Sequence, residues 1–414
     1  MQDCFDIIII GAGIGGITAA QTALTSSGTT RVLLINGEDC PPYDRPPLSK
    51  AMLAGDATTA DIVLLPQDWQ DAPRLSLRQG RTVTAIDRDG KSILLDDGER
   101  LHYATLILAT GCRPRLLDPD LIDPACRDRI FYLRSLADAQ RLQAQLTATP
   151  RPRLAIVGGG FIGLEVAATA RQAGCPVNVL EVGERLIGRG APATVADFVK
   201  ARHEEAGVGV HLGARLQRIA AREQALALRL EDGSLLQADI VVAGIGALPN
   251  DELARSAGLA CDDGILVDAA CRTSDASIFA IGDAVRLRQA DGQRGERIEH
   301  WNAARQMGEV AATNACGGAA RYSGIPWVWS DQYALNLQFL GVSAAGHRHI
   351  IRGDPASARW ALLEVRDDRL VAATLINQGK ERRNLERLIT SETPLSAAAL
   401  AALGDPAASL KTLA

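Results

Sequence analysis

The chain has 414 residues, too many for one ordinary hydrophobic core, so we expect roughly two to three domains. It carries 44 basic and 49 acidic residues, a formal net charge of −5, and the two signs are interspersed along the sequence. This balance excludes the basic footprint of a nucleic-acid-binding protein and any polyanionic tail. The expected substrate is therefore a small molecule or a protein.

The N-terminus and the apolar segments argue against secretion and membrane insertion. The chain runs from MQDCFDIIII straight into a glycine motif, without the charged region, apolar region or cleavage site of a secretory signal. No apolar stretch approaches the roughly 20 residues that cross a bilayer. We expect a soluble, cytoplasmic protein with no membrane partner.

The eight cysteines are scattered along the chain. No two of them have the C-x-x-C or C-x4-C spacing of a redox disulfide, and the usual spacings of iron–sulfur and zinc ligands are also missing. We therefore expect no metal site and eight reduced, mostly buried thiols.

A first dinucleotide-binding unit is predicted near the N-terminus. The apolar run at 5–10 is typical of a buried parallel strand, and a helical pattern at 17–28 precedes a second strand at 31–36. The turn between the first strand and the helix contains Gly11, Gly13, Gly15 and Gly16. With Glu38 after the second strand, this order indicates a Rossmann-like βαβ unit.

The same order recurs in the middle of the chain. A strand at 153–157, a helix at 164–174 and a strand at 176–181 enclose a second glycine turn. This turn contains Gly158, Gly160 and Gly163, and the second strand ends at Glu181. Such turns let the backbone approach a pyrophosphate at the positive end of the helix, so two dinucleotide sites are predicted.

The remaining elements complete the expected fold. Further apolar strands end in glycine turns at 102–111, 238–250 and 277–284, and antiparallel hairpins are predicted at 82–101. From about residue 326 we expect antiparallel strands, at 326–333, 335–342 and 359–376, then a basic helix at 381–390 and an alanine-rich helical end. The fold class is α/β, with two Rossmann-like dinucleotide-binding domains plus a C-terminal α+β domain.

Several motifs carry a resemblance to a known family. They are PPYDRPPLSK at 41–50, LATG at 108–111, GGGFIGLE at 158–165, GIGALPN at 244–250, IFAIGDA at 278–284 and PWVWSDQ at 326–332. In this order they resemble the FAD-dependent NADH:ferredoxin reductases of bacterial dioxygenase and cytochrome P450 systems, which belong to the glutathione-reductase-like group. The resemblance covers essentially the whole chain, and RPPLSK together with PWVWSDQ is its most specific part.

The resemblance implies that the first unit binds FAD. Gly11, Gly13, Gly15 and Gly16 would contact its pyrophosphate. Glu38 would bind the adenosine ribose, although several relatives carry an aspartate one position earlier, where this chain has Gly37.

Other FAD contacts are also implied by the family. Val83 and Arg134 would flank the adenine end, and Trp301 would lie near the flavin. Asp283 follows a strand and opens a helix, so its carboxylate could accept from a ribityl hydroxyl or simply cap the helix. Trp329 would either lie beside the flavin or pack in a core.

The family also places a charged pair at the flavin. The prolines of the segment at 41–50 stiffen it and hold Arg45 and Lys50 in a pre-ordered conformation. Lys50 would lie beside flavin N5 and pair with Glu165, so that the carboxylate positions a lysine that stabilises charge on the reduced ring. The alternative is an ordinary surface ion pair.

By the same likeness, the second unit binds the nicotinamide cofactor. Gly158, Gly160 and Gly163 would contact its phosphates, and the turn that ends at Gly246 would cover it. A carboxylate at Glu181 accepts from ribose hydroxyls and repels a 2′-phosphate, which favours NADH. Arg185 and Arg189 lie nearby in the sequence, so the strictness of this preference stays open.

The expected organisation is an FAD-binding domain at 1–112 and 250–325, an inserted NAD-binding domain at 113–249 and a C-terminal domain at 326–414. Electrons would pass from NADH through FAD to a separate [2Fe–2S] ferredoxin, which serves a Rieske dioxygenase or a cytochrome P450. The alternatives are reduction of rubredoxin or another acceptor, and a non-enzymatic NADH-sensing flavoprotein. The enzyme would be a monomer or a weak homodimer.

A basic cluster near the C-terminus is a candidate docking surface for the ferredoxin, because small ferredoxins are usually acidic. It consists of Lys380, Arg382, Arg383 and Arg387. Arg383 and Arg387 are four residues apart, so they share one face of the predicted helix with Lys380. The alternative is an ordinary solvated face.

Overall fold

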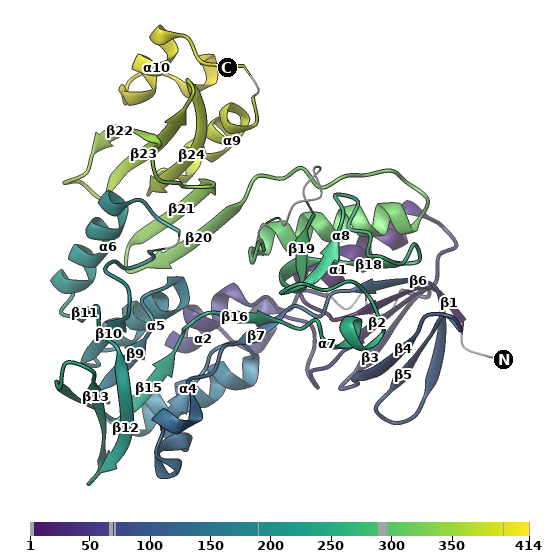
Figure 1. Cartoon of the computed structure of the whole chain (residues 1–414), viewed down its shortest axis with the longest axis horizontal. Coiled ribbons are helices and arrows are strands. Elements are labelled where there is room, and N and C mark those ends of the chain that lie inside the picture. Colours follow the sequence, from purple (N-terminus) through teal and green to yellow (C-terminus); the bar gives the residue numbers. More distant parts are fainter. Residues whose placement is uncertain are drawn as a thin grey trace. The chain divides into compact units, whose positions relative to one another are not determined.

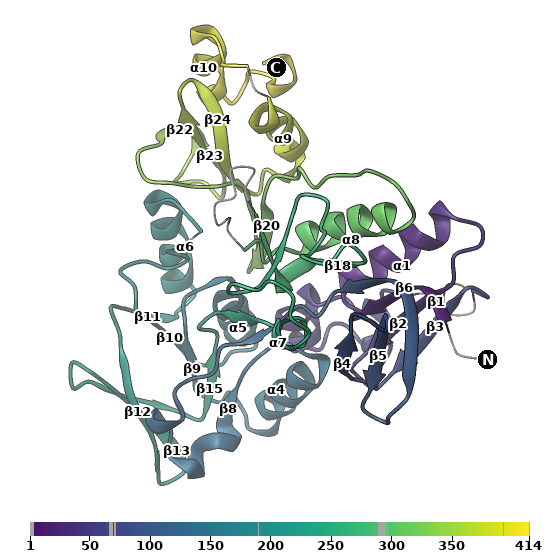
Figure 2. The same ribbon diagram turned by 45° about the vertical axis from the view of Figure 1, so that its right-hand side comes forward.

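The computed structural model describes residues 4–65, 69, 72–188, 190–288, 295, 297–391 and 393–413. They form two compact units. The first comprises Met1–Arg45, Thr58–Arg113 and Ala247–Gly324, and the second comprises Pro46–Ala57, Pro114–Gly246 and Ile325–Ala414. Figures 1 and 2 trace the chain through both units. The predicted division into three domains stays a prediction.

In the part of the chain that the structure describes, a seven-stranded sheet forms the centre of the first unit. Its strands follow the order β3-β2-β1-β6-β5-β4, and β18 also pairs with β6. They are β1 (Cys4–Ile10), β2 (Val32–Asn36), β3 (Leu75–Gln79), β4 (Val83–Asp87), β5 (Ser92–Leu95), β6 (Arg100–Leu108) and β18 (Ile278–Ala280). The β4, β5 and β6 segment forms the antiparallel hairpins predicted at 82–101. The other pairings are parallel, as the apolar runs predicted.

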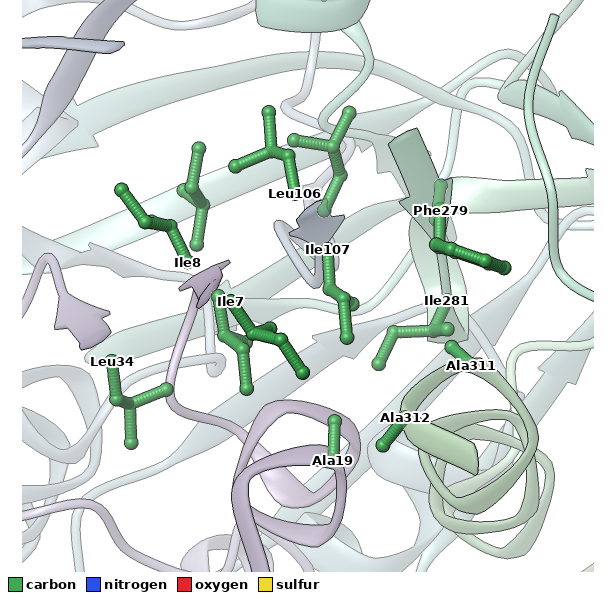
Figure 3. Close-up of a cluster of buried hydrophobic side chains, with 14 of the residues drawn as sticks. Ile7, Ile8, Ala19, Leu34, Leu106, Ile107, Phe279, Ile281, Ala311 and Ala312 are labelled. Atoms are coloured by element: carbon green, nitrogen blue, oxygen red, sulfur yellow. The ribbon is translucent and has the colours of Figure 1, made fainter. Parts of the chain in front are cut away.

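Two helices bury their small residues against this sheet. They are α1 (Ile14–Ser26) and α8 (Trp301–Ala315). Figure 3 shows Ile7 and Ile107 of the sheet directed toward Ala19 of α1 and Ala312 of α8. All four side chains are at most 2% exposed, and burying each isoleucine contributes about 1.5–3 kcal/mol. The alanines let both helices approach the sheet closely.

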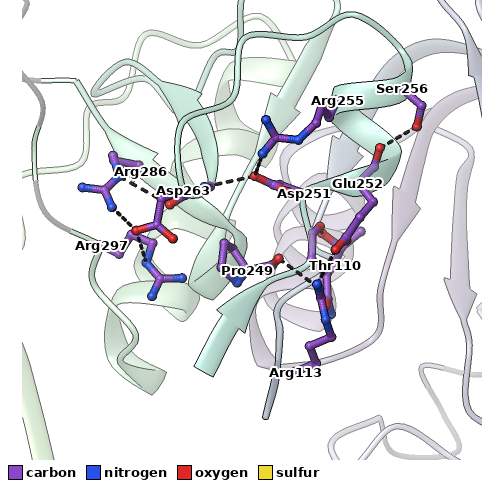
Figure 4. A network of polar contacts seen from close by, with 12 residues as sticks. Thr110, Arg113, Pro249, Asp251, Glu252, Arg255, Ser256, Asp263, Arg286 and Arg297 are labelled. Carbon is purple, nitrogen blue, oxygen red and sulfur yellow. Dashed lines mark hydrogen bonds and ion pairs between the residues drawn. The ribbon is translucent and has the colours of Figure 1, made fainter. Parts of the chain in front are cut away.

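A polar network connects the short strands β7 (Cys112–Pro114) and β16 (Ala247–Pro249) with helix α7 (Glu252–Ser256) (Figure 4). β7 pairs with β16, and α7 follows. Arg113 donates to the carbonyl of Pro249 at 3.2 Å, and Thr110 Oγ1 donates to the carbonyl of Asn250 at 2.7 Å. Asp251 accepts from the backbone N–H of Gly264 at 3.1 Å, where β17 (Ile265–Val267) and its partner β19 (Val285–Leu287) begin to pack.

The second unit contains the second Rossmann-like sheet. Its parallel strands lie in the order β11-β10-β9-β15-β8. They are β8 (Ile130–Phe131), β9 (Leu154–Val157), β10 (Val177–Glu181), β11 (Gly209–Leu212) and β15 (Ile240–Ala243). The helices of this part are α2 (Ala51–Ala54), α4 (Leu136–Ala148), α5 (Phe161–Gln172) and α6 (Ala193–Glu205). A small antiparallel sheet is formed by β12 (Leu216–Arg222), β13 (Ala225–Leu230) and β14 (Leu235–Ala238).

An antiparallel sheet in the order β20-β21-β24-β23-β22 forms the C-terminal part of the same unit. Its strands are β20 (Trp327–Gln332), β21 (Leu335–Gly341), β22 (Arg348–Asp354), β23 (Arg359–Arg366) and β24 (Arg369–Ile376), followed by α9 (Arg382–Thr390) and α10 (Ala397–Gly404). Aromatic pairs join this sheet to the helices. Phe198 of α6 meets Trp360 of β23 edge-on at 5.5 Å, and Phe161 of α5 meets Phe339 of β21 at 5.1 Å. One continuous apolar core therefore includes both parts.

Several elements differ from expectation or were not predicted. β22 was not predicted, because its sequence RHIIRGD mixes charged residues with only two aliphatic ones. The alanine-rich end forms only the short α10 and one 3-10 turn, since Pro394 and Pro406 bracket the helix. Asp283 is the middle residue of a single 3-10 turn (Gly282–Ala284) that runs into β19, and the N-cap of that turn is Ile281, so Asp283 neither opens nor caps a helix. Within the described residues no helix is both long and apolar enough to cross a membrane.

Candidate functional site

The first glycine turn has the geometry of a dinucleotide-binding loop. Gly11 has a φ of +109°, and a Cβ there would lie 2.2 Å from the carbonyl oxygen of Ala109. A Cβ at Gly16 would lie 1.9 Å from the carbonyl oxygen of Gly11, so a side chain there would push α1 off the strand. Gly13 is the N-cap of α1 and offers no side chain, and Gly15 packs near α8. The N–H groups of the first helical turn are thus available to an anion.

Arg45 links this turn to Glu38 within the first unit. A Cβ at Gly13 would lie 2.7 Å from Nη1 of Arg45, and Nη2 of Arg45 pairs with Glu38 at 3.3 Å. Nε of Arg45 is buried and has no hydrogen-bond partner among the described residues. An anionic group beside the turn, such as a pyrophosphate, would satisfy that donor. Tyr43 donates to the other oxygen of Glu38 at 2.7 Å, so the carboxylate is held at the end of β2.

Three further predicted residues lie in the first unit. Trp301, the first residue of α8, donates from its indole N–H to Asp44 at 2.7 Å. Asp283 accepts from the thiol of Cys112 at 3.2 Å. Val83 is buried at the start of β4. Arg134 lies in the second unit, where its backbone N–H donates to Asp138 at 3.2 Å.

His300 was missed by the sequence analysis. It precedes Trp301 at the N-cap of α8, and burial lowers the pKa of its imidazole, although the charge of Asp283 opposes this. Its Nδ1 is buried without a hydrogen-bond partner among the described residues. A single histidine in an irregular segment gives no sequence signal.

The second glycine turn repeats the geometry in the second unit. Gly158 has a φ of +110°, and a Cβ at Gly163 would lie 2.2 Å from the carbonyl oxygen of Gly158. Gly160 is the N-cap of α5, and a Cβ there would meet nothing within 4 Å. Glu181 accepts from the backbone N–H of Gly159 at 2.7 Å and from that of Gly183 at 2.7 Å. Its carboxylate therefore lies directly against the turn.

The neighbouring turn after β15 also approaches this site. A Cβ at Gly158 would lie 2.3 Å from the carbonyl oxygen of Gly244, and Gly246 follows with a φ of +111°. The backbone N–H of Arg115 donates to the carbonyl of Gly246 at 2.9 Å. Arg185 is exposed, and Arg189 lies outside the described residues. The carboxylate of Glu181 is thus the charge that the structure places at the turn.

Lys50 and Glu165 form a close ion pair in the second unit. Lys50 Nζ lies 2.9 Å from Glu165 Oε2, and the side chains are 20% and 3% exposed. Lys50 is the N-cap of α2, and it also donates to the carbonyl of Pro46 at 3.1 Å. Glu165 is on the inner side of α5, so the pair is not an ordinary surface ion pair.

Two hydroxyl groups complete the surroundings of this carboxylate. Ser49 donates to Oε2 of Glu165, and Ser330 of β20 donates to Oε1 at 2.8 Å. Neither serine was predicted as a site residue. Ser330 alternates with Gln332 on the buried face of β20, which is a weak sequence signal for polar residues directed inward.

Trp329 contributes to an aromatic stack on the same strand. Its ring stacks on Trp327 with centroids 5.2 Å apart and an angle of 26°. The guanidinium of Arg382 lies over Trp327, 4.4 Å from the ring centroid. Both tryptophans keep part of their surface exposed.

The basic cluster is only partly available for docking. Arg382 pairs with Glu386 at 2.9 Å, and Arg387 donates to the carbonyl of Lys411 at 2.7 Å. Lys380, Arg383 and Arg387 are exposed. Arg383 and Lys380 therefore form the more accessible part of this surface.

The fold and the two glycine turns define an oxidoreductase-type scaffold for two dinucleotides. Each turn opens a helix, is followed by its own carboxylate and belongs to its own compact unit.

Comparison with known proteins identifies the family. The chain belongs to the pyridine nucleotide-disulphide oxidoreductase family, which matches residues 5–308, and residues 327–414 match the reductase C-terminal family. It is an oxidoreductase that uses FAD and NAD(H). The expected fold class and the resemblance to FAD-dependent ferredoxin reductases are confirmed.

Similar proteins span the full length of the chain. The ferredoxin–NAD(+) reductase component of the anthranilate 1,2-dioxygenase system of Burkholderia cepacia is 40% identical over 98% of each chain. Putidaredoxin reductase of Pseudomonas putida is 37% identical over 99% of this chain and 96% of its own. The covalent putidaredoxin reductase–putidaredoxin complex superposes with a TM-score of 0.91 at 36% identity, covering 99% of this chain and 98% of that chain. The ferredoxin reductase for the CYP199A2 system from Rhodopseudomonas palustris gives 0.90 at 33% identity, covering 99% and 100%.

Proposed function

We propose that this protein transfers electrons from NADH through FAD to a small [2Fe–2S] ferredoxin that serves an oxygenase. The observation that carries the proposal is the pair of glycine turns, each with its own helix N-terminus and its own carboxylate. Full-length similarity to ferredoxin reductases of dioxygenase and cytochrome P450 systems supports the choice of acceptor.

The first turn would hold FAD. The backbone N–H groups that follow Gly13 and the buried Nε of Arg45 would bind the pyrophosphate, and Glu38 would bind the adenosine ribose. FAD, when bound, accepts a hydride and passes on single electrons. Asp283, Trp301 and Trp329 would contact it in the roles that the family implies, with Val83 and Arg134 at the adenine.

The second turn would hold the nicotinamide cofactor. Gly160 leaves open space at the N-terminus of α5, so a pyrophosphate can approach the backbone there. Glu181 would accept hydrogen bonds from the ribose hydroxyls, and its charge would oppose a 2′-phosphate. We therefore expect NADH as the electron donor.

Lys50 and Glu165 would act at the flavin. The lysine would hydrogen-bond the flavin and stabilise negative charge there, while the carboxylate holds the ammonium group in place. Ser49 and Ser330 restrain that carboxylate from two sides.

Thiol chemistry does not enter this proposal. All eight cysteines are free, and four of them are buried. Burial raises the pKa of the Cys271 thiol to about 12 and that of Cys261 to about 11, so both thiols stay protonated and unreactive. Eight free cysteines also suit a reducing compartment, which supports a cytoplasmic location.

Anaerobic titration with NADH and turnover with ferredoxin together test the function. We expect two electrons to reduce the flavin of each subunit completely and an added ferredoxin to reoxidise it rapidly. Consumption of four electrons per subunit would indicate a participating thiol pair. A long-lived reduced complex that ignores ferredoxin would favour the NADH sensor, and faster turnover with rubredoxin would favour that acceptor.

A further inference from the structure

A line of polar side chains leads from Glu165 through the interior of the second unit. Ser330 donates to Glu165 Oε1 at 2.8 Å, and Gln332 Nε2 donates to Ser330 Oγ at 3.0 Å. Gln332 Oε1 lies 2.9 Å from Nε2 of His203. Nδ1 of the same imidazole lies 3.2 Å from the hydroxyl of Tyr333. The line joins α5, β20 and α6, elements whose residues are distant in the sequence.

Burial makes these contacts obligatory. Glu165, Ser330, Gln332 and His203 are all at most 2% exposed. A buried polar atom that loses its hydrogen-bond partner cannot bond to water instead, which destabilises the folded protein. Breaking one contact in the line would therefore leave at least one buried polar atom without a partner. Tyr333 is half-buried, and it ends the line in the turn between β20 and β21.

The hydrogen bonds all point the same way. A negatively charged Glu165 can only accept, so Ser330 must give its single proton to the carboxylate and accept from the amide N–H of Gln332. The amide oxygen then faces His203, so Nε2 must carry a proton and Nδ1 must accept. Tyr333 supplies the donor for Nδ1. If the Gln332 amide were flipped, its oxygen would accept the hydrogen bond from the Ser330 hydroxyl. The hydroxyl oxygen would then direct a lone pair at the Glu165 carboxylate.

The protonation states of the outer members agree with this direction. Burial lowers the pKa of the His203 imidazole, so the ring stays neutral and keeps one donor and one acceptor. Burial raises the pKa of Tyr333 to about 12, so its hydroxyl keeps its proton. Tyr333 also has a φ of +55° and sets its ring edge-on against His203 at 5.1 Å. The turn thus places this hydroxyl at Nδ1.

We propose that Ser330, Gln332, His203 and Tyr333 form a polarised positioning chain that holds the negative charge of Glu165 directed at Lys50. The proposal rests on the proposed function for what Lys50 then does at the flavin. None of the four contacts Lys50 directly in the hydrogen bonds given above, so they are positioning residues that act through Glu165.

The sharpest test compares single substitutions in the positioning chain, made in the FAD-loaded protein. S330A removes the donor to Glu165, H203F removes the link to Gln332, and Y333F removes the terminal donor. T374V is the matched control. Thr374 is 2% exposed in β24 of the same unit, and it is not a member of the hydrogen-bonded positioning chain. FAD content and melting temperature identify variants that fail to fold. S330T, which keeps the hydroxyl, is the conservative variant to compare with S330A.

The first readout needs neither NADH nor ferredoxin. The infrared carboxylate bands of Glu165, recognised by their loss in E165Q, should shift in S330A and H203F but not in T374V. Nitrogen NMR of the wild-type imidazole should show a protonated Nε2 and an unprotonated Nδ1 at His203. Unchanged bands in both folded variants, or the opposite tautomer, would overturn the proposal even if the protein is a ferredoxin reductase.

The second readout follows the reaction. We expect S330A and H203F to lower the limiting rate of flavin reduction roughly 10- to 100-fold, with the Kd for NADH unchanged, and S330T to restore the rate. Y333F should have a smaller effect because it acts through three intervening groups. Wild-type limiting rates in S330A and H203F would contradict the chain. Failure of ferredoxin to accept electrons would contradict the proposed function and leave the infrared result intact.

Discussion

At the scale of single residues, we predict that Glu181 discriminates between NADH and NADPH. Its carboxylate lies against the second glycine turn and already accepts from Gly159 and Gly183, so it cannot easily move away from a 2′-phosphate. We expect kcat/KM for NADH to exceed that for NADPH by roughly 5- to 150-fold. Steady-state kinetics with each cofactor measure this ratio. Equal values would mean that the exposed Arg185 outweighs the carboxylate.

Lys50 and Glu165 should behave as one functional unit. K50Q and E165Q should each slow flavin reduction by roughly 10- to 150-fold, because each change removes a hydrogen bond to a charged group. The double variant should be less than additive. Stopped-flow absorbance of the flavin provides the rates.

A surface ion pair in the same unit offers the control. Lys200 and Glu204 lie 2.6 Å apart on α6, and K200Q should leave the rate unchanged. Wild-type reduction in both K50Q and E165Q would remove the pair from the proposed mechanism.

These site residues differ in how well they can be predicted from the sequence. Gly158, Gly160, Gly163 and Glu181 follow from local spacing, because one short βαβ unit contains all of them, and the same holds for the first glycine turn and Glu38. The pairing of Lys50 with Glu165 came only from family likeness, since 115 residues separate the two in the sequence and no local pattern joins them. Ser49, His203 and Gln332 become visible only when packing brings α5, α6 and β20 together.

At the scale of elements, α9 and the 3-10 turn before it (Gly379–Glu381), which contains Lys380, form the candidate docking face. Lys380 and Arg383 are exposed, whereas Arg387 also donates to the C-terminal backbone and has a structural role. We expect K380E/R383E to weaken ferredoxin reduction at low salt, because opposite charges steer association, and the loss should shrink as salt screens them.

NADH-to-ferricyanide activity is the internal reference for this change, since it needs no protein docking. R222E, which reverses an exposed arginine on β12, is the matched control. A parallel fall of both activities in K380E/R383E would show a structural effect, and no fall at all would place the partner elsewhere.

Elements with strong periodicity were predicted well. The buried strands β1, β6, β9 and β15 and the hairpins of β4 to β6 are confirmed, because continuous apolar runs and Asp-Gly turns have few alternatives. β22 was missed because only tertiary contacts with β23 stabilise its polar sequence.

At the scale of the whole molecule, buried histidines should make stability depend on pH. Burial lowers the pKa of His203 and His300, so the folded protein binds protons less readily than the unfolded chain. Stability should therefore fall as pH drops through about 6.5, by at most about 1.4 kcal/mol per pH unit for each histidine.

Melting temperatures at about pH 8 and about pH 5.5 test this. H203Q should reduce the difference between them. Asp239, whose pKa is lowered by hydrogen bonds from Arg153, affects stability only at lower pH. A wild-type melting temperature that is constant over this window would contradict the assignment of neutral buried histidines.

Electron transfer from the reduced flavin to ferredoxin is tested most directly by a stopped-flow experiment. Protein that has been reduced with one equivalent of NADH is mixed anaerobically with oxidised [2Fe–2S] ferredoxin, and the flavin and iron–sulfur absorbances are followed together. We expect the flavin to be reoxidised as two ferredoxins are reduced, at a rate that rises with ferredoxin concentration and falls with salt. A flavin that remains reduced in the presence of excess oxidised ferredoxin would contradict this expectation.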